Sequence, residues 1–132
     1  MLLDGFNLST LSNRIIATGA LYAVIFAFGF IMTQFGSPYN TILLNIHKFA
    51  SLGAIYLLYR SFNAVHQASG LNTLVIVLGV ITGLTFLGII ATGGLISIGG
   101  DVPEIVYIIH HLMPFLNVAA ATASLYLLYN IN

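Results

Sequence analysis

The sequence predicts an all-α fold, a transmembrane four-helix bundle that crosses the membrane up-down-up-down. Of the 132 residues, 59% are hydrophobic and only 5% are charged, whereas a globular domain in water has about 25% charged residues. Four apolar runs, each long enough to cross a bilayer, follow one another with short links. None of the runs alternates with period two, which disfavours the strands of a membrane barrel. We therefore expect a single integral membrane domain over residues 1–132.

Turn residues separate the four expected spans. The first span covers 15–35 and ends at "GSPYN", and the second covers 41–62, with the polar "NAVHQASGLN" expected as a loop after it. The third covers 73–98 and ends at "GGDVP". The fourth covers 103–129 and starts with proline in the first turn, where its missing amide hydrogen is tolerated.

Basic residues predict the orientation in the membrane. Arg14 precedes the first span and Arg60 closes the second, whereas the opposite loops carry Asp101 and Glu104 and no Lys or Arg. The positive-inside rule then places both termini in the cytoplasm, in what we expect to be a prokaryotic cell membrane. The segment before Arg14 is expected to be a retained polar tail, because no small-residue cleavage site follows it.

A weak internal repeat relates the first two spans to the last two. "GFIMT", which begins at Gly29, is similar to "GIIAT", which begins at Gly88. "NIHK" then corresponds to "IIHH", and this aligns His47 with His110; "IYLLY" and "LYLLY" follow. The offset grows along the second hairpin, so the repeat is imperfect. It predicts two helical hairpins related by an axis along the membrane normal, with both histidines facing that axis.

Depth in the membrane supports the pairing of these two histidines. His47 lies nine residues after Pro38 and His110 seven residues after Pro103, so both lie roughly 10 Å into parallel helices. A neutral imidazole in lipid needs partners for both ring nitrogens. A haem iron would bind one nitrogen, and the other would donate to a carbonyl or hydroxyl group. We therefore expect His47 and His110 to ligate one haem, of b type because the chain has no cysteine.

Small and charged residues near this layer are candidates for contact with the cofactor. Gly29, Gly88 and Gly53 would leave room for a flat ring, although small residues also serve close helix packing in lipid. Lys48 would neutralise a haem propionate or extend its ammonium group toward the headgroups.

The other two histidines have different expected roles. His111 is about 100° around the helix from His110, so both cannot reach one iron, and the repeat favours His110 while leaving His111 as the alternate. His111 would then face a neighbouring helix, a propionate, a quinone or headgroups. His66 is 19 residues from His47, roughly 28 Å along a helix. We interpret it as a solvated interfacial residue and expect one haem rather than two.

Four spans, His47 in "NIHK", His110 in "IIHH" and glycines on the intervening helices resemble the small four-helix transmembrane b-type cytochromes of the cytochrome b561-like group. The resemblance implies a haem held by two histidines on different helices and electron transfer to or from quinone or another redox partner. Larger members hold paired histidines near both membrane faces, whereas this chain has one pair.

Two other functions remain open from sequence. The chain would be a non-catalytic helical subunit or assembly factor of a larger complex if its histidines only form hydrogen bonds. A histidine-based metal or ion transporter is disfavoured, because no acidic residue lies between Asp4 and Asp101. An electron carrier or redox subunit is favoured over a stand-alone enzyme, as a homo-oligomer or within a larger complex, with the lipid bilayer and no nucleic acid as a partner.

Overall fold

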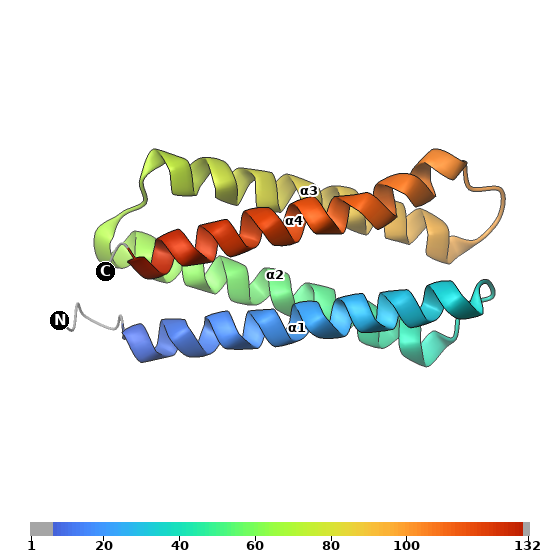
Figure 1. Ribbon diagram of the computed structural model, residues 1–132, viewed down its shortest axis with the longest axis horizontal. Helices are drawn as coiled ribbons and strands as arrows, with labels where there is room; N and C mark the ends of the chain where they lie inside the picture. The colour runs from blue at the N-terminus through green and yellow to red at the C-terminus, as the bar shows by residue number, and fades with distance from the viewer. Residues whose placement is uncertain (1–6, 131–132) are drawn as a thin grey trace.

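Four long helices form the whole of the described structure, a computed structural model that describes residues 7–130 (Figure 1). They are α1 (Leu8–Phe35), α2 (Thr41–Ser69), α3 (Thr73–Ile98) and α4 (Glu104–Asn130). No strand occurs within these residues. The all-α four-helix bundle predicted from sequence is therefore confirmed, with consecutive helices antiparallel and both ends of the described chain at the same end of the bundle.

Asparagine and glycine residues define most helix ends. Asn7, Asn40 and Asn72 accept hydrogen bonds from the first backbone amides of α1, α2 and α3 through their side chains, as N-cap residues do. Gly36 and Gly70 follow α1 and α2 with positive φ angles of 69° and 75°, a conformation that other residues rarely adopt.

Two helices extend beyond the expected spans, and the loop predicted directly after residue 62 was wrong. α1 begins at Leu8 rather than at residue 15, so the part of the expected polar tail that lies within the described residues is helical, and residues 1–6 lie outside the described range. The expected loop after residue 62 is instead helical as far as Ser69. Polar residues there do not break a helix, because the terminating conformation comes only at Gly70.

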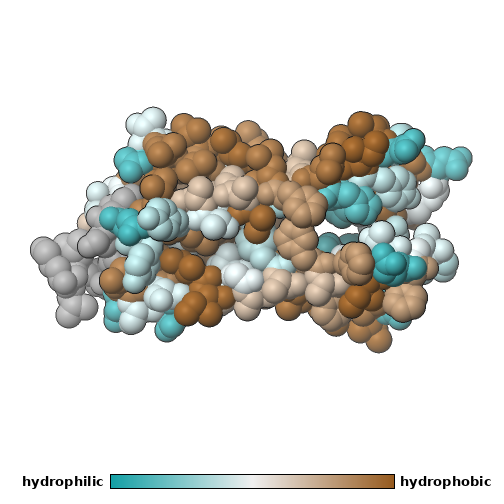
Figure 2. Space-filling model, viewed as in Figure 1, coloured by the Kyte–Doolittle hydropathy of each residue, from teal (hydrophilic) through white to brown (hydrophobic). Residues whose placement is uncertain are grey.

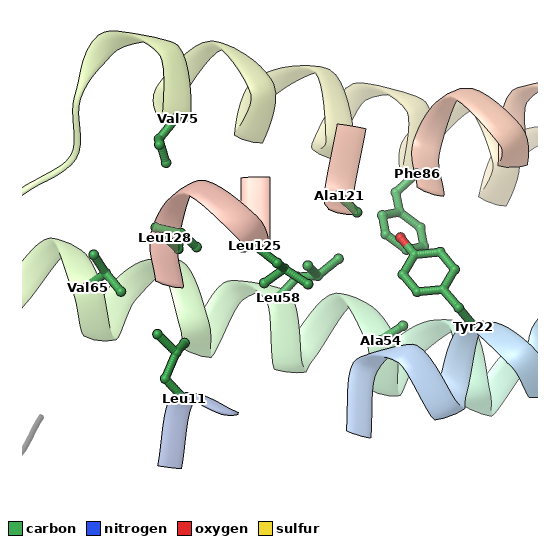
Figure 3. Close-up of a cluster of buried hydrophobic side chains, with 10 residues drawn as sticks. All are labelled: Leu11, Tyr22, Ala54, Leu58, Val65, Val75, Phe86, Ala121, Leu125 and Leu128. Carbon is green, nitrogen blue, oxygen red and sulfur yellow. The ribbon is translucent and has the colours of Figure 1, made fainter. Parts of the chain in front are cut away.

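The helices associate as two hairpins. α1 packs along α2, and α3 packs along α4, whereas contact between the hairpins is limited mainly to α4 with α1 and α2. Ten buried residues form the core, from Leu11 and Leu128 near the termini to Tyr22 and Phe86 near the middle (Figure 3). The hairpins are therefore held together in the half of the bundle that contains the termini.

A buried polar cluster closes this core at mid-bundle. Asn117 on α4 is fully buried; its Nδ2 donates to the Thr82 carbonyl at 2.9 Å and to Thr85 Oγ1 at 2.7 Å. Its Oδ1 accepts from the Tyr22 hydroxyl at 2.5 Å. Asn117 therefore joins α4 to α1 and α3, whereas Ser124 donates to the Ala120 carbonyl of its own helix.

The outer surface of the bundle is apolar. All four helices are long and hydrophobic enough to cross a membrane, and Figure 2 shows brown, hydrophobic residues over most of the visible face, with hydrophilic residues gathered toward the two ends. Large side chains such as Phe30, Phe49 and Leu84 are more than half exposed. In water such a surface would aggregate, so the chain is an integral membrane protein in contact with lipid.

Candidate functional site

His47 projects from α2 against the neighbouring helix α1. Its Nδ1 lies 2.9 Å from the carbonyl oxygen of Ile25. The ring packs against Gly29, where a Cβ atom would lie 3.2 Å from His47 Cε1. The absence of a side chain at Gly29 therefore lets the imidazole lie against the α1 backbone.

His110 is placed in the same way in the second hairpin. Its Nδ1 lies 3.0 Å from Thr92 Oγ1 on α3. It packs on Gly93, where a Cβ atom would lie 2.7 Å from His110 Cε1. Each hairpin thus holds a histidine of its second helix over a glycine of its first helix.

The hydrogen bonds assign the tautomer of both rings. A backbone carbonyl can only accept, so the Nδ1 of His47 carries the hydrogen that it shares with Ile25. The Thr92 hydroxyl donates its own hydrogen to the Gly88 carbonyl at 2.8 Å, so it accepts from Nδ1 of His110. Both imidazoles are therefore protonated on Nδ1, which leaves the lone pair of each Nε2 available to a metal.

The helical segments around the two histidines contain few buried residues. In the helical segments around the two histidines, which are 23–35, 41–53, 87–98 and 104–116, the only buried residues are Met32 and Ala50. Within residues 7–130 no buried side-chain nitrogen lacks a hydrogen bond, so the two Nε2 atoms are not sealed inside the protein. The surface is hollowed between the hairpins at this end (Figure 2).

The two hairpins share the same contact between a glycine and a histidine, but the glycines that make it are not the pair that the sequence alignment matched. Gly93, not Gly88, is the counterpart of Gly29, because each of these two glycines contacts the histidine of its hairpin. Gly88 instead faces Met113, whose Sδ would lie 2.5 Å from an added Cβ. Gly88 therefore does not contact His110, and its expected role of leaving room for a flat ring stays a prediction. The similarity of "GFIMT" and "GIIAT" aligned Gly29 with Gly88, which lies five positions before Gly93, the residue that contacts His110.

Two further candidates lie away from the ring faces. Gly53 contacts Leu21 rather than either histidine, which makes it a packing glycine between α1 and α2. Lys48 is exposed and donates from Nζ to Ser97 Oγ on α3 at 3.3 Å. This hydrogen bond joins the two hairpins at the histidine end of the bundle.

The remaining histidines are exposed. His111 Nδ1 lies 2.6 Å from the carbonyl of Tyr107 on its own helix, and the side chain faces outward. His66 lies in the last turn of α2, at the end that contains Arg14 and Arg60, and is exposed as expected. These placements separate both residues from the space between the hairpins.

Sequence reasoning missed three residues that hold the rings: Ile25, Thr92 and Gly93. The carbonyl of Ile25 carries no sequence signal, because any residue at that position would supply it. Thr92 and Gly93 were detectable. A hydroxyl beside a glycine, about one and a half turns before the end of α3, is a pattern that can both accept a hydrogen bond from an imidazole and make room for its ring.

No set of three or more metal-binding side chains occurs within residues 7–130. No protein-family model matches the chain, and no curated protein or solved structure shows significant similarity to it.

Proposed function

We propose that this chain is a membrane haem b protein of the small four-helix, cytochrome b561-like kind, whose haem would be held by His47 and His110. The observation that carries the proposal is the matched pair of imidazoles, each donating from Nδ1 to its neighbouring helix and each with a free Nε2. Such a hydrogen bond fixes ring orientation and raises ligand basicity in haem and metal sites.

The residues around the pair fit a porphyrin. Two parallel helices carry the ligands at one layer, and the hairpins share few buried residues there. Gly29 and Gly93 keep the imidazoles against their own hairpins, which leaves the space between the hairpins for a planar ring. The apolar helix faces would exclude water from that ring.

Electron transfer is the chemistry that this ligand set supports. A bound haem supplies reversible one-electron oxidation and reduction, and two imidazole ligands leave no iron position open for oxygen or substrate. The hydrogen bonds from His47 to Ile25 and from His110 to Thr92 would tune the potential.

A lipid-facing groove favours quinone as the electron partner. It has a volume of about 560 Å³, runs between α1 and α4, and is lined by uncharged residues that include Ser12, Leu125 and Tyr129. Its lining also includes Tyr22, which is one helical turn from Ile25, the residue that holds His47. A neutral ring with an apolar tail suits such a groove, whereas a charged soluble donor does not.

An absorption spectrum tests the proposal. Protein purified in detergent with added haem should bind one haem per chain and show the sharp reduced bands of a six-coordinate b-type cytochrome after dithionite. His47→Ala and His110→Ala should each remove that spectrum, and His66→Ala and His111→Ala should retain it. A colourless wild-type protein that takes up no haem would instead support the non-catalytic subunit.

Membrane orientation completes the proposal. Arg14 Nη1 donates to the Arg60 carbonyl at 3.1 Å, so the two arginines lie at one end of the bundle, the end of Leu8 and Asn130. By the positive-inside rule this end is cytoplasmic, and the histidine layer lies near the opposite face of a prokaryotic cell membrane.

A further inference from the structure

The two open sides of the space between the hairpins differ in chemistry. On the side of α2 and α3, Lys48 Nζ donates to Ser97 Oγ. On the side of α1 and α4, nearer the viewer in Figure 1, the rings of Phe26 and Phe115 lie 5.6 Å apart, centroid to centroid. One side therefore carries a cation and a hydroxyl group, and the other carries two aromatic rings.

Lys48 carries the positive charge of this end of the bundle. The other two basic residues of the chain, Arg14 and Arg60, lie together at the opposite end. Asp101 and Glu104 are at the end of Lys48, yet the partner of its ammonium group within the described range is the neutral Ser97 hydroxyl. Lys48 lies in a membrane span, next to the proposed haem ligand His47. An ammonium group there costs free energy unless an anion binds it.

The hydrogen bonding of Lys48 leaves donors available for that anion. Ser97 donates its own hydrogen to the Gly94 carbonyl at 2.9 Å, so it accepts one of the three ammonium hydrogens of Lys48. The other two remain for a carboxylate. The repeat gives the second hairpin no equivalent cation, because the position that corresponds to Lys48 is His111, which is exposed and bonded to its own helix.

We infer that Lys48 and Ser97 form the binding site for the carboxylate edge of the porphyrin, so that the ring enters the bundle in one orientation. The two propionates face α2 and α3, and the uncharged edge faces Phe26 and Phe115. This inference rests on the proposed haem function. It adds that the ammonium group of Lys48 determines which edge of the porphyrin faces α2 and α3. Its chemistry is that of a charge-assisted hydrogen bond between ammonium and carboxylate.

Two porphyrins that differ only in the propionates test the inference. Apoprotein in an uncharged detergent, which offers Lys48 no lipid phosphate, is titrated with haemin and with haemin dimethyl ester, and binding is followed by the Soret band. The wild-type protein should bind haemin about tenfold more tightly than the diester. In Lys48→Gln that ratio should fall to about one, with the affinity for the diester unchanged.

Matched variants separate this role from a general effect of charge. Lys48→Arg should keep most of the preference for haemin, and Arg60→Gln, which removes a cation at the other end of the bundle, should keep all of it. Because partition of each porphyrin into micelles is the same for every variant, the change in the ratio is decisive. Equal ratios in Lys48→Gln and the wild type would overturn the inference while leaving haem binding intact. Failure of the wild type to bind either porphyrin would overturn the proposed function, and this inference with it.

Discussion

Thr92 Oγ1 accepts a hydrogen bond from Nδ1 of His110 across α3 and α4, at 3.0 Å, whereas His47 donates to a backbone carbonyl. Of the two hydrogen bonds that orient the proposed ligands, the one to Thr92 can therefore be removed by a side-chain substitution. Thr92→Val keeps the shape of the side chain and deletes the acceptor.

We predict that Thr92→Val raises the midpoint potential of the bound haem. Without the acceptor, His110 donates less electron density to iron, which disfavours the oxidised state. The shift should not exceed about 60 mV, the equivalent of about 1.4 kcal/mol for one electron. A redox titration followed by the reduced absorption band measures it, and Thr92→Ser is the control that should retain the wild-type potential. An unchanged potential in Thr92→Val would show that the hydroxyl does not act on a ligand.

Gly93→Ala should disrupt the His110 ligand. The added methyl carbon would lie 2.7 Å from Cε1 of the imidazole, a distance at which the ring must move. The neighbouring Gly94→Ala is a matched control, because nothing lies within 4 Å of the carbon that it adds. We expect Gly93→Ala to lose most of the six-coordinate haem spectrum and Gly94→Ala to keep it, with both proteins equally helical by circular dichroism.

Sequence patterns predicted the fold well because lipid imposes a strong constraint. Every backbone polar group in a membrane must be satisfied within the span, so a long apolar run in this chain has one reasonable conformation. The errors fall outside those runs. Residues 63–69 are polar and were expected as a loop, yet they continue α2 because the first residue that ends the helix is Gly70.

The candidate site was predictable in its histidines and less so in its supporting residues. The depth of His47 and His110 follows from their distance along the chain from the preceding turns, and these turns can be recognised in the sequence. The contact of Gly93 depends on the rotation of α3 against α4, and residues five positions apart on a helix are separated by more than one turn. A short motif match, such as the one at Gly88, cannot determine that rotation.

Reporter fusions should find the C-terminus on the cytoplasmic side. The two arginines lie at that end and are joined by a hydrogen bond from Arg14 to the Arg60 carbonyl, and positive charges are retained in the cytoplasm during insertion. A cytoplasm-active reporter after Asn132 should be active and a periplasm-active reporter inactive. Replacing both arginines with glutamine should give a mixed orientation, and an unchanged one would show that other features determine topology.

Tyr22→Phe should destabilise the bundle more than Tyr126→Phe. The Tyr22 hydroxyl is buried and donates to the fully buried Asn117, which in turn donates to Thr82 and Thr85 on α3. Removing that hydroxyl leaves Asn117 Oδ1 without its donor at the junction of the two hairpins, and we expect a loss of about 1 kcal/mol, the usual size for a hydrogen bond between membrane helices. Tyr126 is 68% exposed, so deletion of its hydroxyl should change the free energy of unfolding little.

Unfolding in mixed micelles measures the stability of both variants. A double-mutant cycle with Asn117→Leu isolates the interaction energy between Tyr22 and Asn117, which should be zero if the two side chains do not interact.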